Sequence, residues 1–319
     1  MRVGRAAGVT DTGRRRLRNE DAFVCEPPLF AVADGMGGAR AGETAARLTA
    51  TVLEGSSTVP TGQDGLVELI VEANRLIWEQ ALADPSKAGM GTTVTAALVD
   101  PGNGTLAIGH VGDSRAYRWR AGSLEQLTTD HSLVAELVSS GVLTPEEAER
   151  HPQRSAITRA LGTEPSVEVE AFTVSVEPGD VFLLCSDGLS TMVSDDAVAD
   201  AIRSSDGDPA AAAEALVIAA NAHGGEDNIT VVLFELEEGD EAPVDRAAPT
   251  TPAAELQEEL PEEAASPEPA GGDGAERGDG EAADVSRHGA GAGGRLAALA
   301  LIAAVVLVGL LALYWGLGR

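Results

Sequence analysis

Cysteine is scarce in this sequence. The two cysteines among the 319 residues are Cys25 and Cys185, and the chain has no C-x-x-C pair and no cluster of cysteine with histidine. Structural zinc sites use such clusters, and disulfide frameworks need more cysteines, so neither is expected. The lack of a disulfide framework suits a reducing cytosol. Cys185 lies inside the apolar run VFLLC and is interpreted as a small core residue.

Basic residues are also few. Lys and Arg number 22 against 51 Asp and Glu, so the formal charge at pH 7 is 22 − 51 = −29. Nucleic-acid binding depends on Lys and Arg that neutralise phosphates, so nucleic acid is excluded as an expected partner. A chain this acidic should not adhere by charge to an anionic membrane surface either.

An apolar leader segment is absent from the N-terminus, where Met1 to Thr10 contain no hydrophobic run typical of a signal peptide. The C-terminus differs, because residues 296–317 are uncharged and apolar over about the length, roughly 20 residues, that a bilayer requires. Tyr314 and Trp315 lie near one end, as in the aromatic belts of membrane proteins. We therefore predict a transmembrane anchor at residues 295–319, with the preceding chain on the cytoplasmic side of the cell membrane.

Large apolar residues are nearly absent between residues 239 and 294, a stretch that is acidic and rich in proline and glycine. Such a segment cannot bury enough apolar surface to offset its chain entropy, so it is predicted to be a disordered linker. This leaves residues 1–238 as one globular domain.

Within residues 1–238, strand-like and helix-like patterns are grouped. Apolar runs typical of strands occur at residues 92–100, 106–112, 167–174, 181–187 and 229–236. Helical spacing of apolar residues is clearest at 42–55 and 64–84, and two more helices are expected near the end of the domain. Because helices come in pairs and strands in groups, we predict an α+β fold with antiparallel sheets covered by helices.

The stretch LFAVADGMGG, residues 29–38, joins a buried strand to an aspartate and several glycines. A buried carboxylate without a partner is costly, so Asp34 needs an explanation. Asp34 could open a tight turn in which Gly35 supplies a positive φ, the glycines could hold a nucleotide phosphate, or Asp34 could bind a metal ion. The nucleotide interpretation is weak because Arg40 stands where G-x-G-x-x-G requires its last glycine.

Asp34 is one of five aspartates that suggest a common site: Asp21, Asp34, Asp113, Asp187 and Asp227. All but Asp21 lie where a predicted core strand meets a turn, so the strand ends could bring the carboxylates together. Clustered carboxylates repel one another unless cations compensate them. Oxygen ligands without Cys or His favour Mg²⁺ or Mn²⁺, and two ions sharing one carboxylate would form a hydrolytic site for phosphoryl groups.

Eight segments over about residues 8–236 resemble, in order, the bacterial metal-dependent Ser/Thr protein phosphatases of type 2C, the PPM family. They are RLRNEDAF, ADGMGGARAGETAA, GMGTTVTAAL, HVGDSRAY, LTTDHSLVAELVSSG, LTPEEAERHPQRSAITRALG, LLCSDGLS and GGEDNITVVL. The resemblance implies a four-layer sandwich of two antiparallel β-sheets flanked by helices. It also implies hydrolysis of phosphoserine and phosphothreonine by a water that bridges two Mn²⁺ or Mg²⁺ ions, with a third ion in bacterial members.

The resemblance further implies roles for the matched residues, with Asp34 bridging the two core ions. The other residues on the metal side would be Gly35 through its carbonyl, Asp187 and Asp227 at the second ion, Asp113 at the third ion, and Glu20 and Asp21 through bound waters.

The resemblance assigns the substrate phosphate to Arg16, four residues before Glu20, through a bidentate fork. The ordinary interpretation of the surrounding run GRRRLR is a basic surface loop without chemistry. A flap at about residues 130–160 would border the site and carry His151 and Ser155. The segment Thr144-Pro145-Glu146-Glu147 predicts a short flap helix with a capping box.

The predicted enzyme is therefore a membrane-tethered protein Ser/Thr phosphatase whose partners are phosphorylated proteins. By family analogy, it would counteract a membrane-anchored Ser/Thr kinase, near which the tether raises its effective concentration. Two alternatives remain open at this level. One is a phosphohydrolase acting on small phosphoesters or nucleotides, and the other is a silent binding module, against which the retention of Asp34, Asp187 and Asp227 argues.

Overall fold

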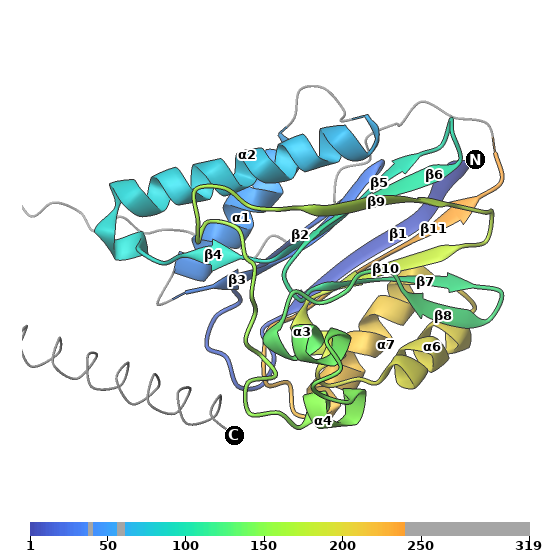
Figure 1. The fold of residues 1–319 in the computed structure, drawn as a ribbon. Helices are drawn as coiled ribbons and strands as arrows, with labels where there is room; N and C mark the ends of the chain where they lie inside the picture. The colour runs from blue at the N-terminus through green and yellow to red at the C-terminus, as the bar shows by residue number, and fades with distance from the viewer. Residues whose placement is uncertain (38–40, 56–60, 240–319) are drawn as a thin grey trace, which may run out of the picture. The chain divides into compact units, whose positions relative to one another are not determined.

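The computed structural model describes residues 1–37, 41–55 and 61–239 of the chain. They form an α+β fold with two antiparallel sheets (Figure 1). The strand order of the first sheet is β1 (Arg2–Asp11), β11 (Ile229–Glu237), β10 (Val181–Cys185), β7 (Arg115–Arg120) and β8 (Ser123–Gln126). The second has the order β2 (Asp21–Glu26), β3 (Leu29–Met36), β5 (Val94–Asp100), β6 (Thr105–Val111) and β9 (Glu170–Ser175), and β4 (Gly91–Thr92) pairs with β3.

Helices cover the outer face of each sheet, which makes four layers (Figure 1). The second sheet packs against α1 (Ala41–Glu54) and α2 (Gly62–Ala83). The first sheet packs against α6 (Asp195–Ser204) and α7 (Pro209–Ala222). The predicted α+β class and its antiparallel sheets are confirmed.

The apolar runs of the central strands follow from this layering. In β3, Phe30 and Val32 face the core between the sheets, whereas Leu29 and Ala31 face the helices. Both faces of the strand are buried, so its sequence is continuously apolar and does not alternate with polar residues. The same holds for β10, where Cys185 is fully buried and free, as predicted for a core residue.

The core between the sheets concentrates the few aromatic residues of the chain. Phe, Trp and Tyr make up only 3% of the sequence, yet three phenylalanines meet in this one place. The rings of Phe30 and Phe234 stack with centroids 4.0 Å apart, and Phe182 lies 5.4 Å from Phe234. Because Phe30 belongs to one sheet and Phe182 and Phe234 to the other, this cluster fixes the two sheets face to face.

Several helix ends agree with the sequence-based expectations. Ser194 caps α6 by accepting a hydrogen bond from the backbone of Ala197. Helix α4 (Pro145–Glu149) begins with the predicted capping box between Thr144 and Glu147. Strands β1, β2, β7 and β8 were not among the expected strands.

The described residues 1–37, 41–55 and 61–239 contain no helix that is both long and apolar enough to cross a membrane. The predicted transmembrane segment, and the predicted linker after Gly239, lie outside the described residues.

Candidate active site

The hairpin of β2 and β3 places two carboxylates opposite each other, because Asp21 pairs with Asp34 in the antiparallel register. Like charges in directly opposed positions destabilise a sheet. The pair lies at the end of the sheet where β3 meets the start of α1, so the repulsion is concentrated in one place (Figure 1).

Asp21 also joins the two sheets. Its Oδ2 accepts hydrogen bonds from Ser186 Oγ at 2.9 Å and from Thr230 Oγ1 at 2.6 Å, both on the first-sheet side. Its Oδ1 is buried and has no hydrogen-bond partner among the described residues. Burial raises the pKa of Asp21 to about 7, although the two hydroxyl bonds act in the opposite direction.

Asp187 and Asp227 come together where β10 ends and β11 begins. Asp187 opens the short helix α5 (Asp187–Ser190) directly after β10. A Cβ on Gly188 would lie 1.9 Å from the carbonyl oxygen of Asn228, so only glycine allows this close approach of the two backbones. Burial raises the pKa of Asp187, and Asp227 adds to the effect.

Asp34 lies at the centre of the carboxylate cluster. Burial raises its pKa well above the usual range, and Asp21, Asp187, Asp113 and Asp227 each raise it further. The structure thus brings the other four candidate aspartates, from separate segments of the chain, close enough to Asp34 to raise its pKa.

Gly35 has a different role from the one that a tight turn would require. Strand β3 continues through Asp34 and Gly35 to Met36, and the positive φ of +136° belongs to Gly37. The prediction that the strand ends at Asp34 is therefore wrong. A Cβ on Gly35 would lie 2.3 Å from the carbonyl oxygen of Gly42 and 2.5 Å from that of Glu20, so glycine is needed here because three backbone segments meet.

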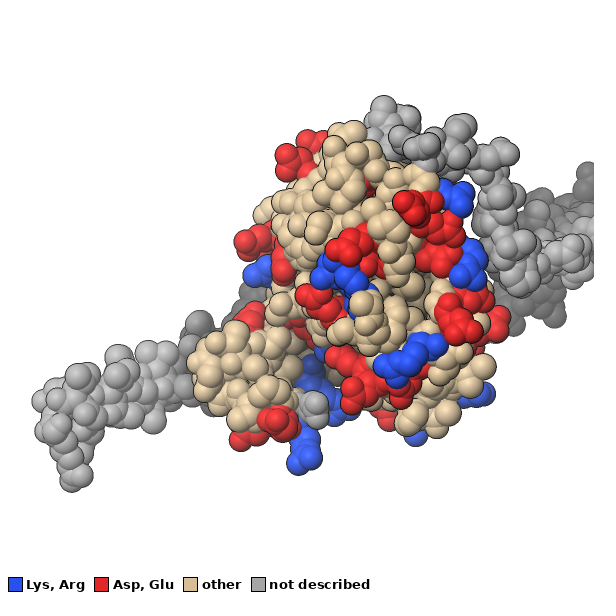
Figure 2. Space-filling view, turned by 90° about the vertical axis from the view of Figure 1, so that its right-hand side faces the viewer, with Lys and Arg blue, Asp and Glu red and all other residues tan. Residues whose placement is uncertain are grey.

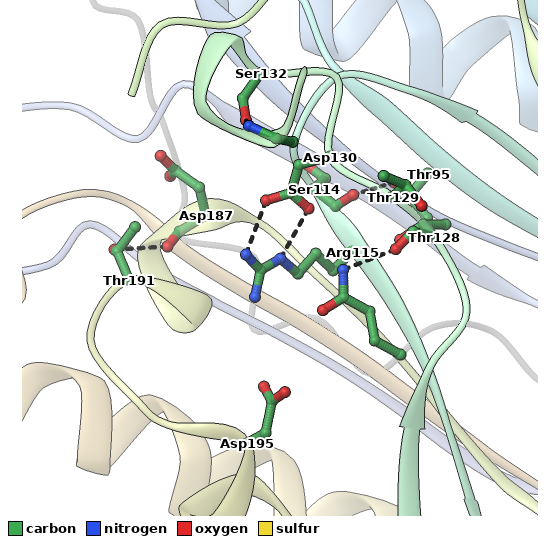
Figure 3. A network of polar contacts seen from close by, with 12 residues as sticks. Thr95, Ser114, Arg115, Thr128, Thr129, Asp130, Ser132, Asp187, Thr191 and Asp195 are labelled. Carbon is green, nitrogen blue, oxygen red and sulfur yellow. Dashed lines mark hydrogen bonds and ion pairs between the residues drawn. The ribbon is translucent and has the colours of Figure 1, made fainter. Parts of the chain in front are cut away.

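Asp113 lies in the turn between β6 and β7, next to Gly112 with φ +113°. Burial raises its pKa to about 7, and Asp187 and Asp130 contribute. Figure 3 shows this side of the cluster, where Arg115 and Asp130 point toward each other and Asp187 lies nearby. Arg115 forms two hydrogen bonds with Asp130, from Nε to Oδ1 at 2.9 Å and from Nη2 to Oδ2 at 2.8 Å.

Arg16 reaches the cluster from the exposed loop between β1 and β2. Its Nη2 donates a hydrogen bond of 2.6 Å to Oδ2 of Asp227. Glu20 lies in the same loop, and burial raises its pKa while Arg16 lowers it and Asp227 raises it. One end of the fold therefore combines a dense set of carboxylates with a guanidinium group.

The comparisons with known proteins decide the family. A family model described as Protein phosphatase 2C matches residues 12–213. The chain belongs to the protein phosphatase 2C family. It is a metal-dependent Ser/Thr protein phosphatase, as the sequence predicted.

Relatives and solved structures of this family cover most of the globular part. The chain is 40% identical to the serine/threonine phosphatase stp of Listeria welshimeri serovar 6b over 238 residues, which are 71% of this chain and 93% of that protein. It is similar to the structure of the Mycobacterium tuberculosis phosphatase PstP/Ppp at 41% identity and a TM-score of 0.70, over 74% of this chain and 100% of that one. A structure of the PstP catalytic domain in complex with two manganese ions shares 37% identity and a TM-score of 0.68, over 75% of this chain and 100% of that one.

The predicted flap of this phosphatase 2C chain is attached at its base to the Asp113 turn. The backbone N–H of His131 donates to the carbonyl of Gly112 at 2.7 Å, and the carbonyl of His131 accepts from Thr158 at 2.8 Å. Between them lie α3 (Leu133–Ser139) and α4. Ser155 is exposed, and His151 accepts a hydrogen bond from the backbone of Gln153. Among the described contacts, none joins either of these two side chains to the carboxylate cluster.

Sequence reasoning missed the polar residues that hold the phosphatase carboxylates in place. Asn228 accepts from the backbone of Glu20 at 2.8 Å and donates to the carbonyl of Arg18 at 2.8 Å, so it fastens the β1–β2 loop to the start of β11. Ser186 and Thr230 orient Asp21, as described above. Each of these residues lies within three positions of an aspartate, which was the available signal.

The donor atoms of the cluster suit the metal dependence of the family. All candidate side-chain ligands are carboxylates, the donors that Mg²⁺ and Mn²⁺ favour. Asp21 Oδ1 and Asp187 Oδ1 are buried without a hydrogen-bond partner among described residues, which a cation would remedy. As the side chains of residues 1–37, 41–55 and 61–239 stand, no three His, Cys, Asp or Glu groups already form a metal site.

Proposed function

We propose that Asp34, Asp187 and Asp227 hold a pair of Mn²⁺ or Mg²⁺ ions, with Asp34 shared between them and the carbonyl of Gly35 as a further ligand. Glu20 and Asp21 would act through bound waters, and Asp113 would hold a third ion. The observation that carries this proposal is the convergence of the half-buried aspartates on Asp34, whose pKa all four others raise. Their mutual repulsion and unpaired oxygens support it.

The metal ions and Arg16 would have separate roles, which follow from their positions. The two metal ions, when bound, would activate a water molecule as the nucleophile and neutralise charge on the phosphoryl oxygens. The planar guanidinium of Arg16 can bind two phosphate oxygens at once, which would orient the phosphorus toward the cluster. Asp227 keeps the guanidinium at the edge of the carboxylates through its 2.6 Å bond. Substrate positioning is thus the contribution of this chain's own residues.

The direct test measures phosphate release from a phosphothreonine peptide by the full chain with Mn²⁺ or with EDTA. Asp187→Asn tests the cluster, and Asp196→Asn on the exposed surface of α6 is the matched control. We expect Mn²⁺-dependent turnover in the parent and the control and none in Asp187→Asn. Full activity of Asp187→Asn would falsify the assignment of that residue. Turnover that does not depend on metal would refute the proposed two-metal centre.

We also propose that the phosphatase domain ends near residue 238, and that the linker at 239–294 tethers it to a transmembrane anchor at 295–319. The composition of these segments supports this arrangement. The domain would then work on the cytoplasmic side of the cell membrane, close to a membrane-anchored Ser/Thr kinase whose phosphorylated sites it reverses.

Cell fractionation tests the anchor. The full chain should sediment with membranes and resist extraction by high salt, and a chain that ends at residue 294 should be found in the soluble fraction. Equal distribution of both chains would rule out the anchor. The shortened chain could still hydrolyse the phosphopeptide and yet fail to dephosphorylate the membrane-anchored kinase. That result would support the kinase as a partner.

A further inference from the structure

Arginines in the described residues are mostly paired with carboxylates. At the end of the fold where β1 begins and β11 ends, Arg2 pairs with Glu237 at 2.6 Å and Arg5 with Glu235 at 2.7 Å. Figure 2 looks onto this end and shows basic and acidic side chains interspersed. The arginines that form no ion pair with a described side chain are Arg14, Arg15, Arg18, Arg150 and Arg154.

Three of these unpaired arginines belong to one short segment, residues 14–18, which we term the arginine loop. All five of its residues are exposed, and Arg16 is the one that turns to the carboxylate cluster. Figure 1 shows the loop between β1 and β2 at the same end of the sheets as the end of β3 and the start of α1. The arginine loop therefore lies at the edge of the active site.

The arginine loop is held firmly on the site. The backbone N–H groups of Arg14 and Arg15 both donate to the carbonyl of Gly225, at 2.7 and 3.2 Å. Gly13, with φ +76°, packs so closely on the carbonyl of Asp227 that a Cβ would lie 2.1 Å from it. The backbone positions of Arg14 and Arg15 are thus set by contacts to the segment that carries Asp227, while their side chains stay exposed.

The charge of the chain makes such a cluster unusual. With a formal charge of −29, the chain has many carboxylates that could pair with exposed arginines, as they do elsewhere on the fold. A phosphorylated segment that places its phosphate at Arg16 must pass the arginine loop. Unpaired arginines at this point would attract acidic side chains that lie near the phosphorylated residue.

We propose that Arg14, Arg15 and Arg18 select phosphoprotein segments whose phosphorylated residue is flanked by aspartate or glutamate. This inference rests on the proposed role of Arg16 as the phosphate-binding residue. The arginine loop then determines substrate preference, and the ions that the carboxylates would hold supply the hydrolytic chemistry for any phosphate that is presented to them.

The experiment compares two phosphothreonine peptides that differ only in their flanks, with aspartates in one and asparagines in the other. The full chain with Mn²⁺ is assayed beside the double variant Arg14→Gln/Arg15→Gln. The control is Arg2→Gln/Arg75→Gln, which removes the same charge from exposed sites on β1 and α2. Hydrolysis of p-nitrophenyl phosphate, which has no peptide flanks, reports the reaction itself.

We expect the parent to prefer the aspartate peptide by about threefold to tenfold in kcat/KM, mainly through KM, as suits two exposed charge pairs. The double variant should lose this preference and keep p-nitrophenyl phosphate turnover, whereas the control should keep both. Added salt should also reduce the preference.

Three results would overturn the inference. The parent could show no preference, or the double variant could keep it. Faster turnover of every substrate by the double variant would mean that the arginines bind an acidic segment of the chain itself. Absence of Mn²⁺-dependent p-nitrophenyl phosphate turnover in the parent would instead refute the proposed function, and the inference with it.

Discussion

Nη2 of Arg16 and Oδ2 of Asp227 are joined by a 2.6 Å hydrogen bond across 211 positions of sequence. The other carboxylate oxygen of Asp227 accepts from the backbone of Asn228 at 2.8 Å. Both oxygens of a proposed metal ligand are therefore engaged, one of them by the proposed phosphate-binding residue. An ion that binds Asp227 must share this carboxylate with Arg16 or displace it.

This competition predicts the effect of Arg16→Ala on metal affinity. Removing a positive charge beside the carboxylates should strengthen Mn²⁺ binding by about threefold to tenfold, the range of a partly exposed ion pair. The same variant should raise KM for phosphopeptides. Calorimetric titration of the metal-stripped chain measures the affinity, with Arg15→Ala as the control from the same loop. Weaker Mn²⁺ binding in Arg16→Ala would contradict the competition.

Asp34→Asn should separate stability from function. The amide removes a half-buried charge that four neighbouring carboxylates oppose, so in EDTA at pH 7.5 the variant should have a higher free energy of unfolding than the parent. It should also lose Mn²⁺ binding and turnover. Urea denaturation measures the gain, and exposed Asp196→Asn should stay within about 0.5 kcal/mol of the parent. A destabilised Asp34→Asn chain would show that the carboxylate has a structural partner.

His110 should make the fold sensitive to acid. It is buried in β6, with Nδ1 bonded to Thr95 Oγ1 and Nε2 to the carbonyl of Thr129, and burial lowers its pKa to about 3. The unfolded chain binds this proton near pH 6.5 and the folded chain does not, so His110 stabilises the fold above pH 6.5. That contribution is lost as the pH falls from about 6.5 toward 3.

The measurement compares the parent with His110→Gln by urea denaturation between pH 7.5 and 4.5. Between pH 6.5 and 4.5, the parent should lose up to about 1.4 kcal/mol per pH unit more than the variant. Parallel pH profiles of the two chains would mean that His110 takes up its proton in the folded state.

Gly188→Ala should disrupt the junction that brings Asp187 to Asp227. The added Cβ would lie 1.9 Å from the carbonyl oxygen of Asn228, and a backbone atom cannot rotate away. We expect a loss of about 2–3 kcal/mol in free energy of unfolding, with weaker Mn²⁺ binding. Gly102→Ala is the control, because its Cβ would meet only Asp100 Oδ1 at 3.5 Å. Unchanged stability of Gly188→Ala would show that the two backbones can separate freely.

Local chemistry made much of the fold predictable. Residues buried on both faces give continuous apolar runs, so β3, β10 and β11 could be recognised from their side chains alone. Caps act within one helical turn, so Ser194 and Thr144 could be recognised as well. Strands β1, β2, β7 and β8 could not be recognised in this way, because polar and small residues interrupt their apolar patterns and their partners lie far away in sequence.

The sequence by itself determined which chemistry is available here. It places aspartates beside buried strands and contains no competing Cys or His cluster. It also carries the segments that identify the family, in the family's order along the chain. The tertiary structure alone decided that Asp21 opposes Asp34, that Gly35 is needed for backbone contact and not for a turn, and that Arg16 turns inward from its loop. The physical reason is that each of these relationships is a contact between distant segments, formed only when the two sheets and their connecting loops pack together.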